Sequence, residues 1–272
     1  ITVKGVPLVA VPHRINETRL LRNLGYNAPA PIRTYYDWPG RFKPFQAQKE
    51  AAAFLSMHTR AFNLSELGTG KSLASLWAYD YLRSIGLLNK ALVISPLSTL
   101  ERTWADELFN HFPHLTFGVL HGPKKKRIAL LKEDYDVYVV NHDGVGILEP
   151  HLKTRTDIDL VIVDEIAQCA RNAGTTKWKM INSVVNRHKE PRACWGMSGT
   201  PTPNAPTDAW AQCKLLVPDQ VPPYFGRFKA TVMRQITQFK WIPKPDATET
   251  VRKIMQPAVR FTRDECLDLP PI

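Results

Sequence analysis

Short runs of apolar, β-forming residues alternate along the chain with stretches whose apolar residues recur at helical spacing. The apolar runs predict strands at residues 61–64, 91–95, 116–120, 137–141, 160–164 and 193–198. The stretches with helical spacing predict helices at residues 47–57, from about residue 73, and at residues 99–109, 124–132, 176–187 and 207–216. Alternation of this kind is typical of a mainly parallel sheet covered by helices. The pattern therefore predicts an α/β fold with its functional loops at the carboxyl ends of the strands.

Two regions depart from this alternation. Residues 1–40 contain five prolines and little periodicity, which favours an extended or hairpin-like N-terminal extension. Residues 218–256 interleave prolines, aromatic residues and basic residues. Such a segment either stacks its rings on nucleic-acid bases or packs them on the protein core.

The charge and the cysteines narrow the class of protein. The 272 residues carry a net charge of +11 and have a pI near 9.6, which favours a polyanionic partner, nucleic acid first, over mere solubilisation. Four widely spaced cysteines without a C-x-x-C pair argue against a disulfide framework or a zinc site. The sequence shows neither an apolar run of bilayer length nor a signal-peptide pattern. We expect an intracellular protein, cytoplasmic or associated with the nucleoid or nucleus, without a membrane partner.

Residues 65–72 read Ser-Glu-Leu-Gly-Thr-Gly-Lys-Ser and connect the first predicted strand to a predicted helix. In Gly68-Thr69-Gly70 the two glycines can adopt backbone angles closed to other residues. Successive N–H groups can then point inward and, with the positive end of the helix, surround a polyphosphate. The stretch predicts a phosphate-binding loop.

The end of this loop supplies the side chains that such a site needs. Lys71 is predicted to reach the β- and γ-phosphates of a nucleotide, and Ser72 to hold Mg²⁺ through its hydroxyl. The pattern departs from the usual one only at its first position, where Ser65 replaces glycine. A purely structural glycine turn is the alternative, and the spacing of the Lys-Ser pair disfavours it.

Asp164 and Glu165 follow four apolar residues, as expected for a buried strand that delivers two carboxylates to its carboxyl end. We predict that Asp164 holds Mg²⁺ and that Glu165 is the general base for an attacking water. An Asp-Glu turn alone could be structural. Together with the phosphate loop, the pair predicts nucleotide hydrolysis, with Lys71, Asp164 and Glu165 as catalytic residues.

Two further elements extend the predicted site. Ser198, Gly199 and Thr200 begin a stiff polar turn at the end of the last predicted strand, which could sense the γ-phosphate and pass that state to a bound ligand. Gln46 stands at the start of the first predicted helix, and its amide offers the donor and acceptor that an adenine edge requires. The plain alternative for the turn is an ordinary Gly/Pro loop, and the plain alternative for Gln46 is a solvated helix residue.

These elements together resemble the first RecA-like lobe of superfamily-two helicases and, among them, the Swi/Snf-like DNA translocases. Residues 42–46 resemble the glutamine motif of that family, 66–72 its motif I, 96–100 with Trp104 its motif Ia, 164–165 its motif II, and 198–204 its motif III. Residues 257–263 and 269–271 resemble the stretch that closes the first lobe. The resemblance implies an ATP- and Mg²⁺-dependent enzyme that acts on double-stranded DNA.

The resemblance also implies a domain organisation. Residues 41–217 would form the RecA-like ATP-binding lobe, and residues 218–272 the protrusion and the lobe-closing segment; a protrusion favours packing over base stacking for the aromatic residues there. No segment of the sequence resembles the second RecA-like lobe, which supplies an arginine finger. We expect that lobe on the same polypeptide and expect the 272-residue chain alone to turn over ATP poorly.

Residues that track DNA in the family are matched here at the ends of two predicted strands. The resemblance carries contacts with DNA phosphates over to Pro96, Leu97 and Ser98, and with less support to Asn141 and His142. Contacts of this kind fix position on DNA but read no sequence.

The sequence departs from the family after motif II, where Ile166-Ala167 replaces a small residue followed by histidine, and Arg171-Asn172 comes one residue late. The lost histidine normally connects motifs II and III. Three functions therefore stay open: a double-stranded DNA translocase, which we favour; a processive helicase or restriction-type motor; and a nucleotide-sensing DNA-binding scaffold without turnover.

Overall fold

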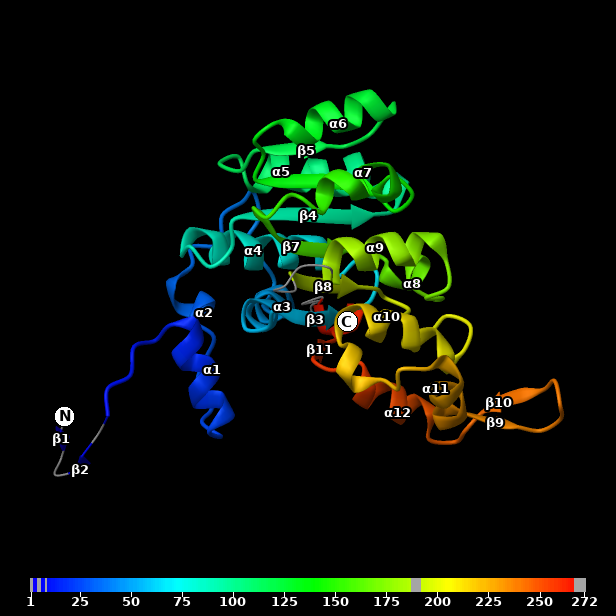
Figure 1. Ribbon diagram of the computed structural model, residues 1–272. Helices are drawn as coiled ribbons and strands as arrows, with labels where there is room; N and C mark the ends of the chain where they lie inside the picture. The colour runs from blue at the N-terminus through cyan, green and yellow to red at the C-terminus, as the bar shows by residue number, and fades with distance from the viewer. Residues whose placement is uncertain (1, 4–5, 8, 187–191, 267–272) are drawn as a thin grey trace, which may run out of the picture.

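Seven strands pair in parallel in one sheet, in the order β11-β3-β8-β7-β4-β6-β5 (Figure 1). The structure is a computed structural model, which describes residues 2–3, 6–7, 9–186 and 192–266. All six predicted strands are present: β3 (Arg60–Asn63), β4 (Lys90–Ser95), β5 (Phe117–Val119), β6 (Val137–Asn141), β7 (Ile158–Val163) and β8 (Ala193–Met197). The seventh, β11 (Ala258–Val259), is too short to leave an apolar pattern in the sequence.

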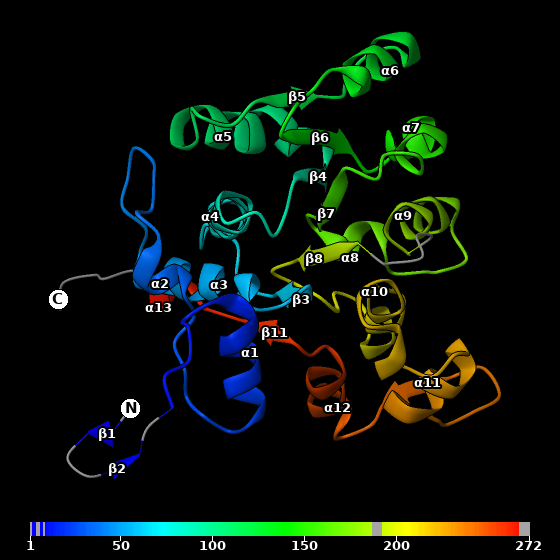
Figure 2. The same cartoon turned by 60° about the vertical axis from the view of Figure 1, so that its left-hand side comes forward.

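The sheet separates two apolar cores, because successive side chains of a strand point to opposite faces. In β4, Leu92 and Ile94 belong to one core, and Ala91 and Val93 to the other. Figure 2 views the sheet edge-on, with α4 and α5 on one side and α7 and α9 on the other. The α/β fold with a parallel, helix-covered sheet is thus confirmed.

The helices divide between the two faces of the sheet. One core is covered by α1 (Ile15–Asn23), α2 (Ile32–Tyr35), α3 (Gln46–Ser56), α4 (Lys71–Ser84) and α5 (Asp106–His111). The other is covered by α6 (Lys124–Lys132), α7 (Val145–Leu152), α8 (Ile166–Cys169), α9 (Thr176–Asn186), α10 (Ala209–Leu216), α11 (Phe225–Val232) and α12 (Ala247–Ile254). Short 3₁₀ turns cover Leu97–Thr99, Pro206–Asp208 and Pro218–Gln220. No helix in the described part of the chain is long and apolar enough to cross a membrane.

Two predictions of local structure need correction. The helix predicted at residues 99–109 is a π-helical segment, Leu100–Ala105, that continues into α5. The N-terminal region contains the antiparallel pair β1 (Thr2–Val3) and β2 (Val6–Pro7), but the extended prediction is wrong for α1 and α2. Ile15 is buried in the core, and Arg19 donates to the carbonyl of Met57 at 2.9 Å. Docking on the lobe therefore stabilises a helix that its weak sequence pattern did not reveal.

The region after residue 218 contains α11, the hairpin strands β9 (Met233–Gln235) and β10 (Trp241–Pro243), and α12. The chain then returns to the sheet edge as β11 and ends in α13 (Arg263–Cys266). Residues 269–271, part of the predicted closing stretch, lie outside the described residues. Because every strand of the large sheet is parallel, the loops after β3, β4, β6, β7 and β8 all meet at one edge.

Candidate nucleotide-binding site

The loop between β3 and α4 has the backbone of a phosphate cradle. Gly68 and Gly70 have φ of +82° and +75°, in the left-handed region that favours glycine, and Gly70 is the N-cap of α4. A Cβ on Gly70 would lie 2.0 Å from the Nε2 atom of Gln48, so a side chain here would displace the Gln48 amide. Thr69 Oγ1 donates to the Glu66 carbonyl at 2.8 Å, which fixes the curve of the loop.

Lys71 is the first residue of α4, and its side chain is buried under the loop. Its Nζ atom donates to the Glu66 carbonyl oxygen at 3.0 Å. Burial lowers the pKa of Lys71, while the negative charges of Glu165 and Asp164 act in the opposite direction. The ammonium group thus lies between the loop and the two carboxylates, where a phosphate group of a nucleotide would need it.

Ser72 has a partner that sequence reasoning missed. Its hydroxyl donates to Oε1 of Glu107 at 2.8 Å, and Glu107 comes from α5. The other carboxylate oxygen of Glu107, Oε2, is buried and has no hydrogen-bond partner among the described residues. Burial raises the pKa of Glu107 to about 7, opposed by the Ser72 hydrogen bond and reinforced by nearby Asp164. The only signal in the sequence was its position three residues after Trp104.

Asp164 follows β7 and is held from three sides. Its Oδ2 atom accepts a hydrogen bond from the indole N–H of Trp104 at 3.0 Å, and its Oδ1 atom accepts one from the N–H of Glu165 at 3.0 Å. His142 Nε2 lies 2.8 Å from the Asp164 carbonyl oxygen. Burial raises the pKa of Asp164, and the Trp104 hydrogen bond opposes the rise. These contacts fix one carboxylate at the sheet edge.

Glu165 is one of the two non-glycine residues with positive φ in the described chain, at +45°. This conformation is strained for a residue with a Cβ and is typical of functional positions. Ser198 Oγ donates to Glu165 Oε2 at 3.4 Å, a long contact that directly connects the end of β8 with the residue after Asp164. Burial and the charge of Asp164 raise the pKa of Glu165. A raised pKa suits a group that must accept a proton near neutral pH.

The turn that begins at Ser198 lies against the phosphate loop. A Cβ on Gly199 would come within 3.2 Å of the backbone nitrogen of Leu67, so only glycine fits there without displacement. The N–H of Thr200 donates to Ser198 Oγ at 3.3 Å. The structure therefore brings the predicted coupling residues into contact with both other elements of the site.

Two glutamines at the start of α3 lie in different surroundings. Gln46 is exposed at the start of α3, and its amide donates to Glu50 Oε1 at 2.9 Å. Gln48 is buried, and its Nε2 atom donates to the carbonyl of Thr69 at 3.4 Å. The adenine contact of Gln46 stays a prediction, whereas Gln48 is the residue of α3 that contacts the phosphate loop.

The closing segment runs beside the phosphate loop. The N–H of Glu66 donates to the carbonyl of Phe261 at 2.9 Å, and the N–H of Phe261 donates to Ser65 Oγ at 3.1 Å. The N–H of Arg263 donates to Glu66 Oε2 at 3.1 Å. The serine that replaces the usual glycine thus has a physical role, since its hydroxyl anchors β11 and the residues after it to the loop.

The predicted DNA contacts divide into an exposed and a buried group. Pro96, Leu97 and Ser98 follow β4, and Leu97 and Ser98 are exposed, Leu97 to 57%. Asn141 is the last residue of β6, His142 follows it, and both are buried. Asn141 Oδ1 accepts a hydrogen bond from Arg127 at 2.9 Å, and His142 supports Asp164. The exposed group is available to a partner, while the buried pair is already used inside the lobe.

The donor atoms at the sheet edge fit a magnesium ion. Mg²⁺ typically takes one or two protein carboxylates, a hydroxyl and phosphate oxygens rather than a complete protein cage. Ser72 and Asp164 supply a hydroxyl and a carboxylate, and the unpartnered Oε2 of Glu107 is an additional acceptor beside them. No cluster of three His, Cys, Asp or Glu side chains able to hold a metal occurs in the described ranges.

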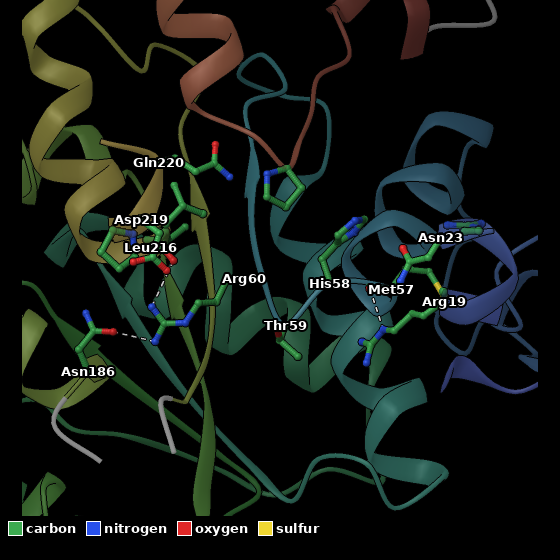
Figure 3. Close-up of a pocket in the computed structure, with 14 residues that line it drawn as sticks. Arg19, Asn23, Met57, His58, Thr59, Arg60, Asn186, Leu216, Asp219 and Gln220 are labelled. Carbon is green, nitrogen blue, oxygen red and sulfur yellow. Dashed lines mark hydrogen bonds between the residues drawn. The ribbon is translucent and has the colours of Figure 1, made fainter. Parts of the chain in front are cut away.

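A cavity of about 680 Å³ lies at the opposite edge of the sheet, where β3 begins. Figure 3 shows Arg60 directed toward Leu216 and Asn186, and Arg19 directed toward Met57. These guanidinium groups donate to carbonyl oxygens at the ends of α10 and α3, which is the usual role of arginine at a helix C-terminus. The arginines therefore join elements of the fold, and the cavity is remote from the phosphate loop.

Comparison with known proteins assigns the chain to a family. The profile of the SNF2-related domain matches residues 47–268, and the chain belongs to this family. Its fold is similar to the Sulfolobus solfataricus SWI2/SNF2 ATPase core in complex with dsDNA, with a TM-score of 0.67 and 22% identity over 83% of this chain and 46% of that one. The Sulfolobus solfataricus SWI2/SNF2 ATPase core domain gives a TM-score of 0.64, with 23% identity over 86% of this chain and 47% of that one.

Two sequence relatives extend the comparison. Putative protein p41 of Acyrthosiphon pisum secondary endosymbiont phage 1 is 29% identical over 153 residues, which cover 54% of this chain and 33% of p41. The ISWI chromatin-remodeling complex ATPase ISW2 of Saccharomyces cerevisiae is 26% identical over 66% of this chain and 16% of its own length. The chain thus spans a third or less of these curated relatives.

Proposed function

We propose that this chain is the ATP-binding lobe of a DNA-dependent ATPase that moves along double-stranded DNA. The observation that carries the proposal is the convergence of Lys71, Ser72, Asp164, Glu165 and Ser198 at one edge of the sheet, with Glu165 hydrogen-bonded to Ser198. A nucleotide-dependent enzyme needs a phosphate-binding cation, a hydroxyl, a metal-binding carboxylate and a base within reach of one another. Membership in the SNF2-related domain family supports the choice of ATP.

Each residue of the site has a distinct role in this proposal. The N–H groups of Gly68 to Gly70 and the N-terminus of α4 bind phosphates, and Lys71 exchanges the Glu66 carbonyl for a phosphate oxygen. Ser72 and Asp164 hold Mg²⁺, which neutralises phosphate charge. Glu165, with its raised pKa, accepts a proton from the attacking water.

The coupling to DNA uses the turn at Ser198. This hydroxyl contacts Glu165, and Gly199 packs on the phosphate loop, so a change at the γ-phosphate reaches the carboxyl ends of the strands. Exposed Leu97 and Ser98, with Pro96, contact DNA phosphates at the same edge. A second RecA-like lobe completes the nucleotide cleft and supplies the arginine finger, and its absence from this chain limits turnover.

The test has a binding arm and a hydrolysis arm. The 272-residue chain should bind ATP with Mg²⁺ and bind a duplex by fluorescence anisotropy, and Lys71→Ala should remove ATP binding while leaving duplex binding in place. A polypeptide that carries this chain with its second lobe should hydrolyse ATP faster with duplex DNA, and Glu165→Gln should abolish that rate. Nucleotide binding without stimulation by duplex, single strands or RNA would overturn the motor and support a nucleotide-sensing scaffold.

That scaffold alternative has one feature in its favour. Ile166 replaces a small residue after motif II, and it is buried against β8, where a Cβ on Gly196 would lie 2.8 Å from its Cδ1 atom. In the family a histidine joins motifs II and III, and this chain has Ala167 at that position. The Glu165–Ser198 contact offers a direct replacement, which is why we favour retained turnover.

A further inference from the structure

The hairpin formed by β9 and β10 projects from the lobe without a partner among the described residues at its tip. Figure 1 shows it extending on the side of the sheet to which the strand arrows point, the side that also carries the nucleotide-binding loops. Phe239 at the tip is 88% exposed, and Ile236 is 51% exposed. Exposed large apolar side chains at the end of a protruding element indicate an interaction surface rather than a part of the core.

The segment that carries the hairpin is strongly basic. Between Asp219 and Asp246 the sequence has five basic residues and no acidic residue: Arg227, Lys229, Arg234, Lys240 and Lys244. A charge of +5 over so short a stretch supplies nearly half of the net charge of +11 of the whole chain. No ion pair offsets any of these five cations within the described residues.

The two faces of the hairpin differ. Trp241 pairs with Gln235, and Lys229 places its Nζ atom 4.2 Å from the ring of Trp241, so this face is tied to α11. Arg234 pairs with Ile242 on the other face. Ile236 and Lys240 follow at two-residue spacing toward the tip, joined by a hydrogen bond of 2.8 Å from the N–H of Ile236 to the carbonyl of Lys240. The outer face therefore combines two cations with apolar side chains.

Local hydrogen bonds fix the shape of the tip. The N–H groups of Phe239 and Lys240 donate to Thr237 Oγ1 at 3.4 and 3.0 Å, and Gln235 Nε2 donates to the carbonyl of Gln238 at 3.2 Å. The turn thus holds the ring of Phe239 outward without support from the rest of the lobe. A preorganised surface loses less conformational entropy when a partner binds.

We propose that this hairpin is a second duplex-DNA contact, in which Arg234 and Lys240 bind phosphates and the tip side chains Ile236 and Phe239 enter the minor groove. The proposal rests on the proposed function, because it takes the nucleic acid on the carboxyl-end edge as its starting point. The positive charge of the hairpin favours a polyanionic partner. Many proteins that bind the minor groove insert apolar side chains there, with basic residues beside them. Two-stranded β-ribbons are among the elements that proteins place in DNA grooves.

The experiment measures binding of the 272-residue chain to a fluorescent 30-base-pair duplex over a range of salt concentrations. Arg234→Ala/Lys240→Ala should weaken binding about tenfold or more and reduce the slope of log K against log salt by about 2, about 1 for each phosphate contact. Phe239→Ala should weaken binding up to about tenfold and leave the slope unchanged, because it removes apolar contact only. All three side chains are exposed, so the variants should fold normally.

Arg14→Ala/Arg33→Ala is the matched control, since it removes the same charge from exposed positions in the N-terminal region. If wild type binds duplex and the hairpin and control variants lose affinity equally, the hairpin contact is overturned and the proposed function stays intact. Wild type that does not bind duplex would overturn both. Binding to vesicles with 30% anionic lipid that exceeds duplex binding and is lost in the hairpin variant would replace DNA with a lipid surface.

Discussion

Glu107 offers the sharpest test of how this site is built, because its carboxylate is buried with one oxygen unpartnered. Burial raises its pKa from 4.5 to about 7. A raised carboxyl pKa means that the folded chain binds more protons than the unfolded chain between these values, so stability falls as pH rises through that window. At about 1.4 kcal/mol for each tenfold change in acidity, the ionised group destabilises the fold by about 3 kcal/mol at pH 8.

The variant Glu107→Gln removes the charge and keeps the shape and the acceptor for Ser72. In the ligand-free chain we expect it to be more stable than wild type by about 3 kcal/mol at pH 8, and by less than about 0.5 kcal/mol at pH 4.5, where the folded wild-type group is already neutral. Urea unfolding at the two pH values measures the difference. Glu101→Gln, at an exposed position of the same segment, is the control and should change stability by under about 0.5 kcal/mol at both.

The same variant should respond less to ligand. If Glu107 and Asp164 face Mg²⁺, the bound cation favours the ionised form of Glu107, so ATP with Mg²⁺ should raise the melting temperature of wild type more than that of the variant. Equal stability of variant and wild type at pH 8 would refute the argument, because an ionised, buried and unpartnered carboxylate must lower the stability of the fold.

Three further predictions concern other parts of the lobe. Gly70→Ala should lower stability by about 1–3 kcal/mol through positive φ and contact with Gln48, and part of the loss should disappear in a Gln48→Ala background; full additivity of the two changes would contradict the contact. Trp104→Phe removes the indole donor of a buried carboxylate and should cost about 1–3 kcal/mol in urea unfolding, while an unchanged midpoint would show that water replaces the indole. The guanidinium group of Arg155 holds the pKa of Asp157 low, so the stabilisation from this ion pair is present above pH 4 and lost as pH falls. The difference in unfolding free energy between wild type and Asp157→Asn should therefore shrink between pH 5 and pH 2. A constant difference would exclude the ion pair as its source.

After motif II this chain has Ile166-Ala167 where the family has a small residue followed by histidine. In this chain, which lacks the family histidine, the hydrogen bond from Ser198 to Glu165 connects the residue after Asp164 with the turn after β8. His142, from the loop after β6, contacts the Asp164 carbonyl instead, and burial lowers its pKa, so it acts as a neutral support. His142 and Ser198 thus connect the ends of β6 and β8 to the Asp164–Glu165 pair that follows β7.

The sequence alone determined the parts of the protein that depend on local patterning. Alternating apolar runs and helical spacing predicted six strands of the parallel sheet, and the glycine-lysine-serine loop identified α4 and its N-terminus. Parallel strands place their carboxyl ends at one edge, so the approach of Asp164 to Lys71 followed from the topology. The role of each of these residues stays a proposal until nucleotide binding is measured.

Only the tertiary structure decided which distant side chains meet at that edge. Glu107 reaches Ser72 because a π-helical segment sets the position of α5, and Gln48 rather than Gln46 faces the loop because of how α3 packs. The two-residue strand β11 and the helix α1 exist because they dock on the lobe, which their own short or proline-flanked sequences do not encode. Contacts between residues far apart in sequence depend on packing, and periodicity carries no information about them.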